Sequence, residues 1–491
     1  MKRCLYLFLF LSASLYGQSQ TTYSLEDCRH MATSHNKDVQ IAKEKVNAAK
    51  NLSKAAKTQY LPSFTANGSY LRNQKDISLL GSDQYLPVYT TSADGKPSFY
   101  NSVNNSWYIS NGMPVAPLDD NGVPFDPTAN PEKIKWKNLA YIPKDQFTFD
   151  TKNIYTGSII MTQPLFMGGK IRELNRLAES NKRIADASLQ GEISETIANT
   201  DAAYWRIVSL VNKEKLANSY VGLLKKLESD LDKSVAIGVA TKSDELSVKV
   251  KLNEAEMTLM QVQDGLSLSK MALCQLCGLP LKADFTLADE SMQSLPQAQT
   301  GSTDQAVTVE NRYEIKSLEE AVNIAESNKK IMVSRFMPNA GLTAGYLTSN
   351  PSMFNGFQNE FAGQFQVGVV VSVPLFHWGE RVHTLRSAQN EKNIALFKLQ
   401  DAKEKVELDI TQANFKTEEA VKKLKMTVSN KEKADENLKC ANIGFESGVV
   451  PASTVMEAQT AWLKANSDNI DAQIDVQLCQ VYLQKALGRL N

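Results

Sequence analysis

The sequence predicts a mainly α-helical protein with a small β part, built from long antiparallel α-helical hairpins. Three observations lead to this fold class. One structural unit is written twice along the 491-residue chain. Each copy holds two short runs in which apolar and polar residues alternate, as they do in strands with two different faces. Each copy also holds long stretches with little or no proline and glycine, whose apolar residues recur at helical spacing.

Two constant offsets define the repeat. Pro164 and Pro374 stand in matching phrases 210 residues apart, whereas "YLPSF" at 60–64 answers "FMPNA" at 336–340 with an offset of 276. The difference of 66 residues (276 − 210) is extra sequence in the first copy, inside a segment rich in Asn, Ser, Pro and Asp. We therefore expect a first repeat over 18–281 with a long inserted loop at 72–150, a linker at 282–311 and a second repeat over 312–491.

The N-terminus has the pattern of a secretory signal. Lys2 and Arg3 precede a short apolar stretch, and small residues follow up to Gly17. This order predicts a signal peptide over 1–17 and export of the mature chain. Beyond it, no run approaches the roughly 20 apolar residues of a membrane helix. The 54 basic residues balance the 54 acidic ones, so no net charge points to a nucleic-acid partner.

Four alternating runs are the expected strands, two in each copy. They cover 63–70 and 155–162 in the first copy, and 339–346 and 364–373 in the second. Period-two alternation puts apolar residues on one face and polar residues on the other. A strand over a soluble core and a transmembrane strand between lipid and water both produce this pattern.

The long helical segments favour the membrane alternative. Residues 170–232 and 380–441 contain no proline and only two glycines, Gly191 and Gly222, so each would extend roughly 95 Å at 1.5 Å per residue. Seams in steps of three and four residues demand neighbouring helices along this length. One seam is Val248, Leu252, Ala255, Leu259, Val262 and Leu266; another is Val406, Ile410, Ala413, Thr417, Ala420 and Leu424. The strands therefore have no separate soluble core to cover.

Four strands cannot close a membrane barrel alone, because single-chain barrels have at least about eight strands and open edges are not tolerated in lipid. If the strands are transmembrane, the barrel is shared between subunits. Two subunits would supply eight strands and three would supply 12; a wide helical tube favours three or more.

Proline and glycine mark the joints between strands and helices. Proline lacks an N–H and cannot continue a strand ladder, and glycine allows the chain to turn into a helix. The expected joint residues are Pro62, Pro164, Gly169, Pro338, Pro374 and Gly379.

No catalytic, cofactor or metal site is expected. Cys274 and Cys277 form a CxxC pair, but no second pair or nearby histidine completes a zinc site, and buried small residues are the preferred interpretation. The four histidines lie in no recognisable nucleophile or metal motif. We therefore predict that the protein is not an enzyme.

Several phrases recur in the same order in both copies. They are the strand-Pro-Leu-Phe-x-x-Gly entries at 164–169 and 374–379, the phrases "AIGVATKSDEL" at 236–246 and "FESGVVPASTVMEA" at 445–458, and the closing "LCGLP" and "ALGRL". In this order they resemble the TolC-like outer-membrane efflux proteins over about 24–491. The resemblance implies a homotrimer in the outer membrane of a Gram-negative bacterium, with four strands from each subunit in a 12-stranded barrel. It further implies a helical barrel through the periplasm, which meets a periplasmic adaptor (membrane fusion) protein and an inner-membrane pump.

The same resemblance implies sites at the periplasmic ends of the hairpins. The expected adaptor contacts are Ile237, Gly238, Val239, Gly448, Val449 and Val450, and the expected pore gate is Ser243, Asp244, Phe445, Thr454 and Glu457. Thr454 replaces one of two acidic residues of the relatives, and Val450 replaces an arginine. An arginine-centred lock is therefore not expected, and the resemblance leaves an acidic constriction formed by Asp244 and Glu457. Without the resemblance, the alternative interpretation is that both are ordinary solvated charges on helices.

The predicted function is a passive exit duct for small toxic solutes. A second hypothesis within the same fold is the exit duct of a type I protein-secretion system. A third, from another class, is a periplasmic coiled-coil adaptor or scaffold; two matched long hairpins with paired membrane-type strands argue against it.

Overall fold

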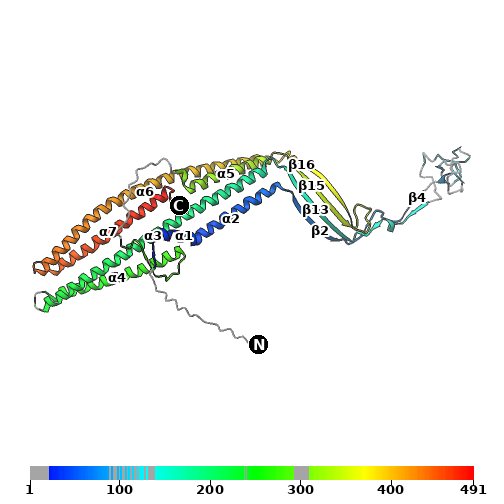
Figure 1. The fold of residues 1–491 in the computed structure, drawn as a ribbon. Coiled ribbons are helices and arrows are strands. Elements are labelled where there is room, and N and C mark those ends of the chain that lie inside the picture. Colours follow the sequence, from blue (N-terminus) through cyan, green and yellow to red (C-terminus); the bar gives the residue numbers. More distant parts are fainter. Residues whose placement is uncertain are drawn as a thin grey trace, which may run out of the picture. The chain divides into compact units, whose positions relative to one another are not determined.

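The computed structural model describes residues 21–87, 139–236, 240–291 and 309–490, together with Gly238 and short pieces between 90 and 130. The chain divides into two compact units (Figure 1). A helical unit comprises Met1–Gln59, Gly168–Met337 and Pro374–Asn491, and a strand unit comprises Tyr60–Met167 and Pro338–Val373. The predicted mainly α fold with a smaller β part is confirmed.

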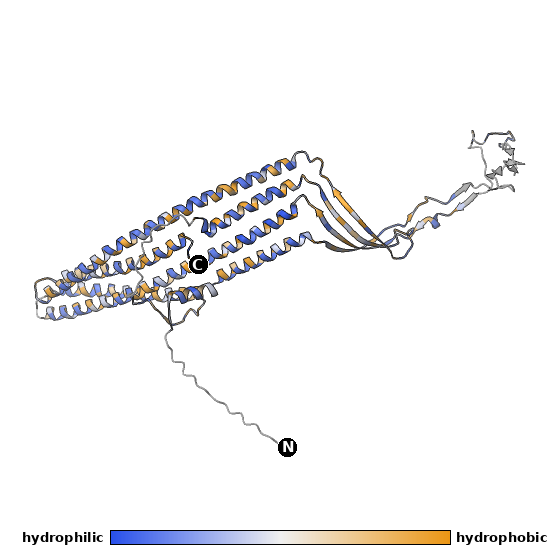
Figure 2. Ribbon diagram, turned by 45° about the horizontal axis from the view of Figure 1, so that its top comes forward, coloured by the Kyte–Doolittle hydropathy of each residue, from blue (hydrophilic) through white to orange (hydrophobic). Residues whose placement is uncertain are grey.

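Seven helices build the helical unit in its described part. They are α1 (Leu25–His35), α2 (Lys37–Lys57), α3 (Lys170–Ala236), α4 (Lys242–Cys277), α5 (Tyr313–Ser334), α6 (Glu380–Glu446) and α7 (Ala452–Ala486). Helices α3 and α6 have 67 residues each, and their first residues are 210 positions apart (380 − 170). Each runs into a partner helix through a short turn, which makes the two predicted long hairpins. Figure 2 shows hydrophilic and hydrophobic residues mingled along these helices.

The predicted seams lie inside the unit. Val248, Leu252 and Ala255 of α4 are buried, as are Val406 and Ile410 of α6. Apolar residues of α3, α4, α6 and α7 meet in one cluster near the turns of both hairpins, which we call the tip cluster. Its buried members are Leu227, Leu231, Val248, Leu438, Ala441, Ala452, Val455 and Ala458. No helix in the described part of the chain is long and apolar enough to cross a membrane.

Part of the expected linker is a strand instead. Residues Phe285–Leu287 form β14, which pairs in parallel with β1 (Thr21–Tyr23). Phe285 and Leu287 are buried in a core cluster, and the Lys270 ammonium lies 5.4 Å from the centre of the Phe285 ring. Burial of these two apolar side chains therefore anchors the segment. The polar residues around them in the sequence gave no indication of a strand. Residues 292–308 lie outside the described part.

Matching glycines lie at the ends of α4 and α7, and the first is packed much more tightly than the second. A Cβ at Gly278 would lie 2.6 Å from the Cβ of His35, and a Cβ at Gly488 would lie 3.6 Å from Cδ of Arg312. Both glycines have positive φ, so they end their helices in a left-handed turn. Glycine is needed at Gly278 because a side chain there would collide with α1.

The strand unit centres on one four-stranded antiparallel sheet. Its order is β16 (Ala362–Ser372), β15 (Asn339–Asn350), β13 (Asn153–Phe166) and β2 (Ser63–Arg72). The four predicted strands are thus confirmed. The register aligns Phe365, Tyr346, Ile159 and Ala66 on one face, and Gln364, Leu347, Ser158 and Asn67 on the other. One face is therefore mainly apolar and the other mainly polar, as the alternation predicts.

The inserted segment forms short antiparallel ladders rather than an unstructured loop where it is described. Strand β3 (Ile77–Ser78) pairs with β12 (Thr148–Phe149), and β4 (Gln84–Pro87) pairs with β11 (Leu139–Ile142). The remaining strands are two-residue pieces: Thr90–Thr91, Pro97–Ser98, Tyr100–Asn101, Ser106–Trp107, Ile109–Ser110 and Met113–Pro114.

Candidate functional site

The turns of the two hairpins are built alike. Gly238 (φ +77°) follows α3 and Gly448 (φ +76°) follows α6. The Gly448 and Val449 amides donate to Phe445 O at 2.9 Å and Gly444 O at 2.8 Å, which closes the end of α6. The predicted adaptor contacts Gly238, Gly448 and Val449 are exposed and Val450 is half-buried. Ile237 and Val239 lie outside the described residues.

One pocket at the tip brings several of the predicted residues together. It has a volume of about 680 Å³, and Asp244, Phe445 and Gly448 to Val450 are among its lining residues. The Phe445 ring packs against the tip cluster. Phe445 therefore contributes to the hydrophobic packing of the hairpin ends. The pocket joins residues of both turns, but of the predicted gate residues it holds only Asp244 and Phe445.

The Asp244 carboxylate is engaged in a helix cap. It accepts hydrogen bonds from the Thr241 amide at 3.2 Å and the Thr241 hydroxyl at 2.7 Å, while the Thr241 Oγ1 accepts one from the Asp244 amide at 3.3 Å. This reciprocal pattern is a capping box at the start of α4. The hydrogen bonds from Thr241 lower the pKa of Asp244 below its usual value. The charged Asp244 side chain therefore stabilises the N-terminus of α4.

Glu457 lies in a different cavity. A groove of about 770 Å³ runs between α4 and α7, lined by Val250 and Glu254 on one side and by Met456, Glu457 and Lys464 on the other. Glu457 is exposed and Thr454 is half-buried in the first turn of α7. Ser243 is exposed and lines neither cavity. Within one chain, Asp244 and Glu457 therefore do not share a pocket.

A buried acidic residue next to Asp244 escaped the sequence analysis. The Glu245 side chain is covered and accepts hydrogen bonds from Lys242 at 2.6 Å and Lys249 at 2.7 Å. Lys249 also lies 3.7 Å from Asp232 of α3, so the charge network links both helices of the hairpin. The two lysines hold the pKa of Glu245 below its usual value. Helical spacing alone could have suggested the pairs, but not the burial of Glu245.

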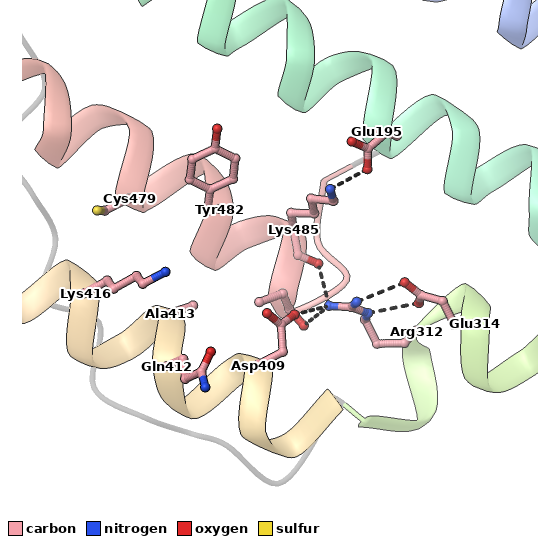
Figure 3. Close-up of a pocket in the computed structure, with 11 residues that line it drawn as sticks. Glu195, Arg312, Glu314, Asp409, Gln412, Ala413, Lys416, Cys479, Tyr482 and Lys485 are labelled. Atoms are coloured by element: carbon pink, nitrogen blue, oxygen red, sulfur yellow. Dashed lines mark hydrogen bonds and ion pairs between the residues drawn. The ribbon is translucent and has the colours of Figure 1, made fainter. Parts of the chain in front are cut away.

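A third cavity is lined by Arg312 and by residues of α3, α5, α6 and α7 (Figure 3). It has a volume of about 450 Å³. The buried Arg312 guanidinium pairs with Glu314 at 2.9 Å and Asp409 at 3.3 Å, and donates to Ala486 O at 2.8 Å. Arg312 thereby fastens the start of α5 to α6 and to the end of α7. Its hydrogen-bonding capacity serves the fold, and no group of three or more metal-ligating residues occurs in the described ranges.

The predicted joints fall at element ends, with one exception. Pro62 and Pro338 precede β2 and β15, Pro374 follows β16, and Gly379 is the N-cap residue of α6. Pro164 instead lies within β13, opposite Gly341, beside an irregularity in the register. Gly169 and Gly379 have positive φ values of 86° and 84°. These values explain the need for glycine at both positions.

Comparisons with known proteins identify relatives of this chain. A family model described as "Outer membrane efflux protein" matches residues 307–489. The alkaline protease secretion protein AprF of Pseudomonas aeruginosa is 23% identical over 254 residues, covering 50% of this chain and 51% of AprF. The solvent efflux pump outer membrane protein SrpC of Pseudomonas putida is 22% identical over 344 residues, covering 68% of this chain and 71% of SrpC. The match to AprF thus spans about half the length of that relative.

The fold has solved counterparts. The outer membrane protein VceC of Vibrio cholerae superposes with a TM-score of 0.66 at 16% identity, covering 94% of this chain and 96% of VceC.

Proposed function

We propose that this chain, which belongs to the TolC-like outer membrane efflux proteins, is the outer-membrane exit duct of a tripartite efflux system. It passively conducts small toxic solutes outward. The observation that carries the proposal is the combination of a two-faced four-stranded sheet with two 67-residue helices in one chain. A sheet that is apolar on one face and polar on the other suits a wall between lipid and water. The family is a class of channel proteins, and we propose no catalysis and no cofactor.

The working form is a homotrimer that contributes four strands per subunit to a 12-stranded barrel. The sheet has two edges, β2 and β16, and lipid does not tolerate unpaired strand edges. Pairing β2 of one copy with β16 of the next would satisfy both.

Two exposed helical stripes support the same assembly. On α6, the exposed residues Phe397, Leu408, Phe415 and Met426 follow steps of 11 and 7, which place them on one helix face. On α4, exposed apolar residues recur at heptad-like spacing: Leu246, Val250, Met257, Met260, Leu268 and Met271. Phe397, for example, is 70% exposed in a single chain. Such stripes suit contacts between copies along the helical barrel.

A periplasmic adaptor docks at the turns of the hairpins and links the duct to an inner-membrane pump. The exposed Gly238, Gly448 and Val449 support this position, because they offer backbone and small side chains at the ends of both hairpins. The gate that we propose nearby uses Asp244 and Glu457, three copies of each in the trimer. Since Asp244 also caps α4, the gate charge and the helix end are coupled.

Residues 1–17 are proposed as a signal peptide that directs the chain to the periplasm and the outer membrane of a Gram-negative bacterium. We place the inserted segment 72–150 on the outer surface. The first repeat (18–281) and the second repeat (312–491) would then each supply one strand pair and one hairpin.

The alternative within the same fold is the exit duct of a type I protein-secretion system. AprF, a relative over half of the chain, is named for alkaline protease secretion, which favours this alternative. SrpC, which the chain matches over a longer range, is named for solvent efflux. The hypothesis from another functional class is a periplasmic coiled-coil adaptor or scaffold. The strand unit argues against it.

Fractionation of cells and planar-bilayer recording test the proposal. The full-length protein should be recovered with the outer membrane, migrate as a heat-modifiable oligomer and conduct ions in stepwise events. Recovery in the soluble periplasm would rule out both duct hypotheses. Deletion of the gene should sensitise cells to solvents if the cargo is small, and should abolish export of a secreted protein if the cargo is a polypeptide.

A further inference from the structure

The turn that enters α6 exposes apolar side chains to an unusual degree. Leu375 is 89% exposed and Trp378 is 90% exposed. The rings of Phe376 and Trp378 pack edge to face, with centroids 4.9 Å apart. A pair of aromatic rings that contact each other and little else offers a large apolar surface for an external partner.

Trp378 also has a strained backbone. Its φ is +47°, in the left-handed region that residues other than glycine rarely adopt. The matching position in the first copy, 210 residues earlier, is Gly168, with φ +60°. A Cβ at Gly168 would lie 2.6 Å from the Met337 Cβ, so glycine is required there. The same type of turn can therefore be built with glycine, and the fold itself gives no reason for a strained tryptophan.

Cations accompany this apolar surface. Arg381 donates to Nδ1 of His377 at 2.7 Å, whereas the nearby Glu380 is paired with Arg335 at 3.1 Å. Neither Arg381 nor Arg386 has an ion-pair partner in the described ranges. Positive charge in the first turns of a helix interacts unfavourably with the helix dipole. Arg381 and Arg386 therefore do not stabilise the start of α6 electrostatically. They are available to an anionic partner.

We propose that the turn 375–381 is a phospholipid-binding surface in the headgroup layer of the membrane. Leu375, Phe376 and Trp378 enter the boundary between headgroups and acyl chains, where tryptophan is preferred. Arg381, oriented by His377, binds a headgroup phosphate, because a guanidinium matches phosphate oxygens. Trp378 follows the end of β16 by six residues, so it lies within roughly 22 Å of that strand end. This inference rests on the proposed outer-membrane location.

Quenching of tryptophan fluorescence by brominated lipid tests the proposal. The full-length protein would be reconstituted in vesicles of phosphatidylethanolamine and phosphatidylglycerol with phosphatidylcholine brominated near the top of the acyl chain. Trp378→Phe should remove most of the lipid-quenched emission. The matched control Trp462→Phe, in a side chain that donates to Asp435 in the helical unit, should leave that quenching unchanged.

Two further variants separate lipid binding from a structural role. Trp378→Gly, which copies the first repeat, should keep or raise the melting temperature in detergent because it relieves strain, while the quenching is lost. A lowered melting temperature would indicate that the ring serves the fold and would overturn the proposal. Arg381→Gln should reduce the number of phosphatidylglycerol molecules that the protein retains in native mass spectrometry. Arg381→Lys, which keeps the charge, should reduce this number less.

Failure of the inference is distinguishable from failure of the proposed function. If the protein inserts and conducts but Trp378 emission is unquenched, the function stands and the lipid surface is wrong. Protection of Trp378 from iodide in detergent, with no lipid quenching, would assign the surface to a second copy of the chain. If the protein does not insert into vesicles at all, both proposals fail.

Discussion

Replacing Asp244 by alanine should destabilise the first turn of α4, at the tip of the first hairpin. This effect is separate from any change in the charge that lines a pore. The substitution removes the carboxylate that accepts from the Thr241 amide at 3.2 Å and from the Thr241 hydroxyl at 2.7 Å. Loss of a capping interaction costs about 1 kcal/mol and at most about 2 kcal/mol. A change of this size makes opening of the first turn of α4 roughly 5- to 30-fold more frequent.

Hydrogen exchange measured by mass spectrometry on peptides covering 241–250 would report this opening. Asp244→Glu should exchange like the wild type, because glutamate at this position also completes a capping box. Glu457→Gln is the matched charge control, since Glu457 is exposed and takes no part in the cap. Asp244→Ala should speed exchange, whereas Glu457→Gln should not.

The pH dependence has a definite sign. Because hydrogen bonds lower the pKa of folded Asp244, the cap contributes stability above the ordinary carboxyl pKa of about 3.9. This contribution is lost as the pH falls through the lower folded value, so exchange should accelerate only in strong acid. An Asp244→Ala variant whose ion selectivity changes while exchange at 241–250 does not would refute the cap and make Asp244 a pore charge alone.

The remaining predictions concern other parts of the helical unit. Arg29→Ala should cost about 3–5 kcal/mol at neutral pH, seen as a lower thermal midpoint, because it strands the fully buried Asp201 carboxylate that Arg29 holds at 2.8 and 2.6 Å. Burial raises the pKa of Asp201, so the loss should shrink in acid, where the carboxyl is neutral; an undiminished loss would contradict this. Maleimide should label the exposed Cys440 in the native state but spare the three buried thiols until unfolding, since burial also raises the pKa of Cys274. Phe415→Ala should weaken the trimer by about 1.5–3 kcal/mol per interface, measured as dissociation in detergent, and leave the separated chain as helical as before.

The long helices and the repeat could be predicted because their signals extend over many residues. The helices α3 and α6 lack proline, and their seams repeat often enough to identify the buried face. The four strands were also predictable, since alternation survives in short runs. The structure added the register, which sequence alternation alone cannot supply.

Features that span only a few residues, or that depend on contacts between distant parts of the chain, were harder to predict. Strand β14 has three residues, too few for a periodic signal, and depends on burial of Phe285 against distant helices. The sequence shows the Thr-x-x-Asp pattern of a capping box at Thr241. The family resemblance, however, implied that Asp244 is a charge of the pore gate. That Glu457 lines a separate groove depends on how α4 faces α7, which spacing within one helix cannot reveal.

Native mass spectrometry of the protein extracted from the outer-membrane fraction tests the central claim most directly. The proposed duct predicts a complex of three copies of this chain, released into detergent as one particle. A single chain, or a complex of another size that is found in the soluble periplasmic fraction, would contradict the shared barrel and with it the proposed exit duct.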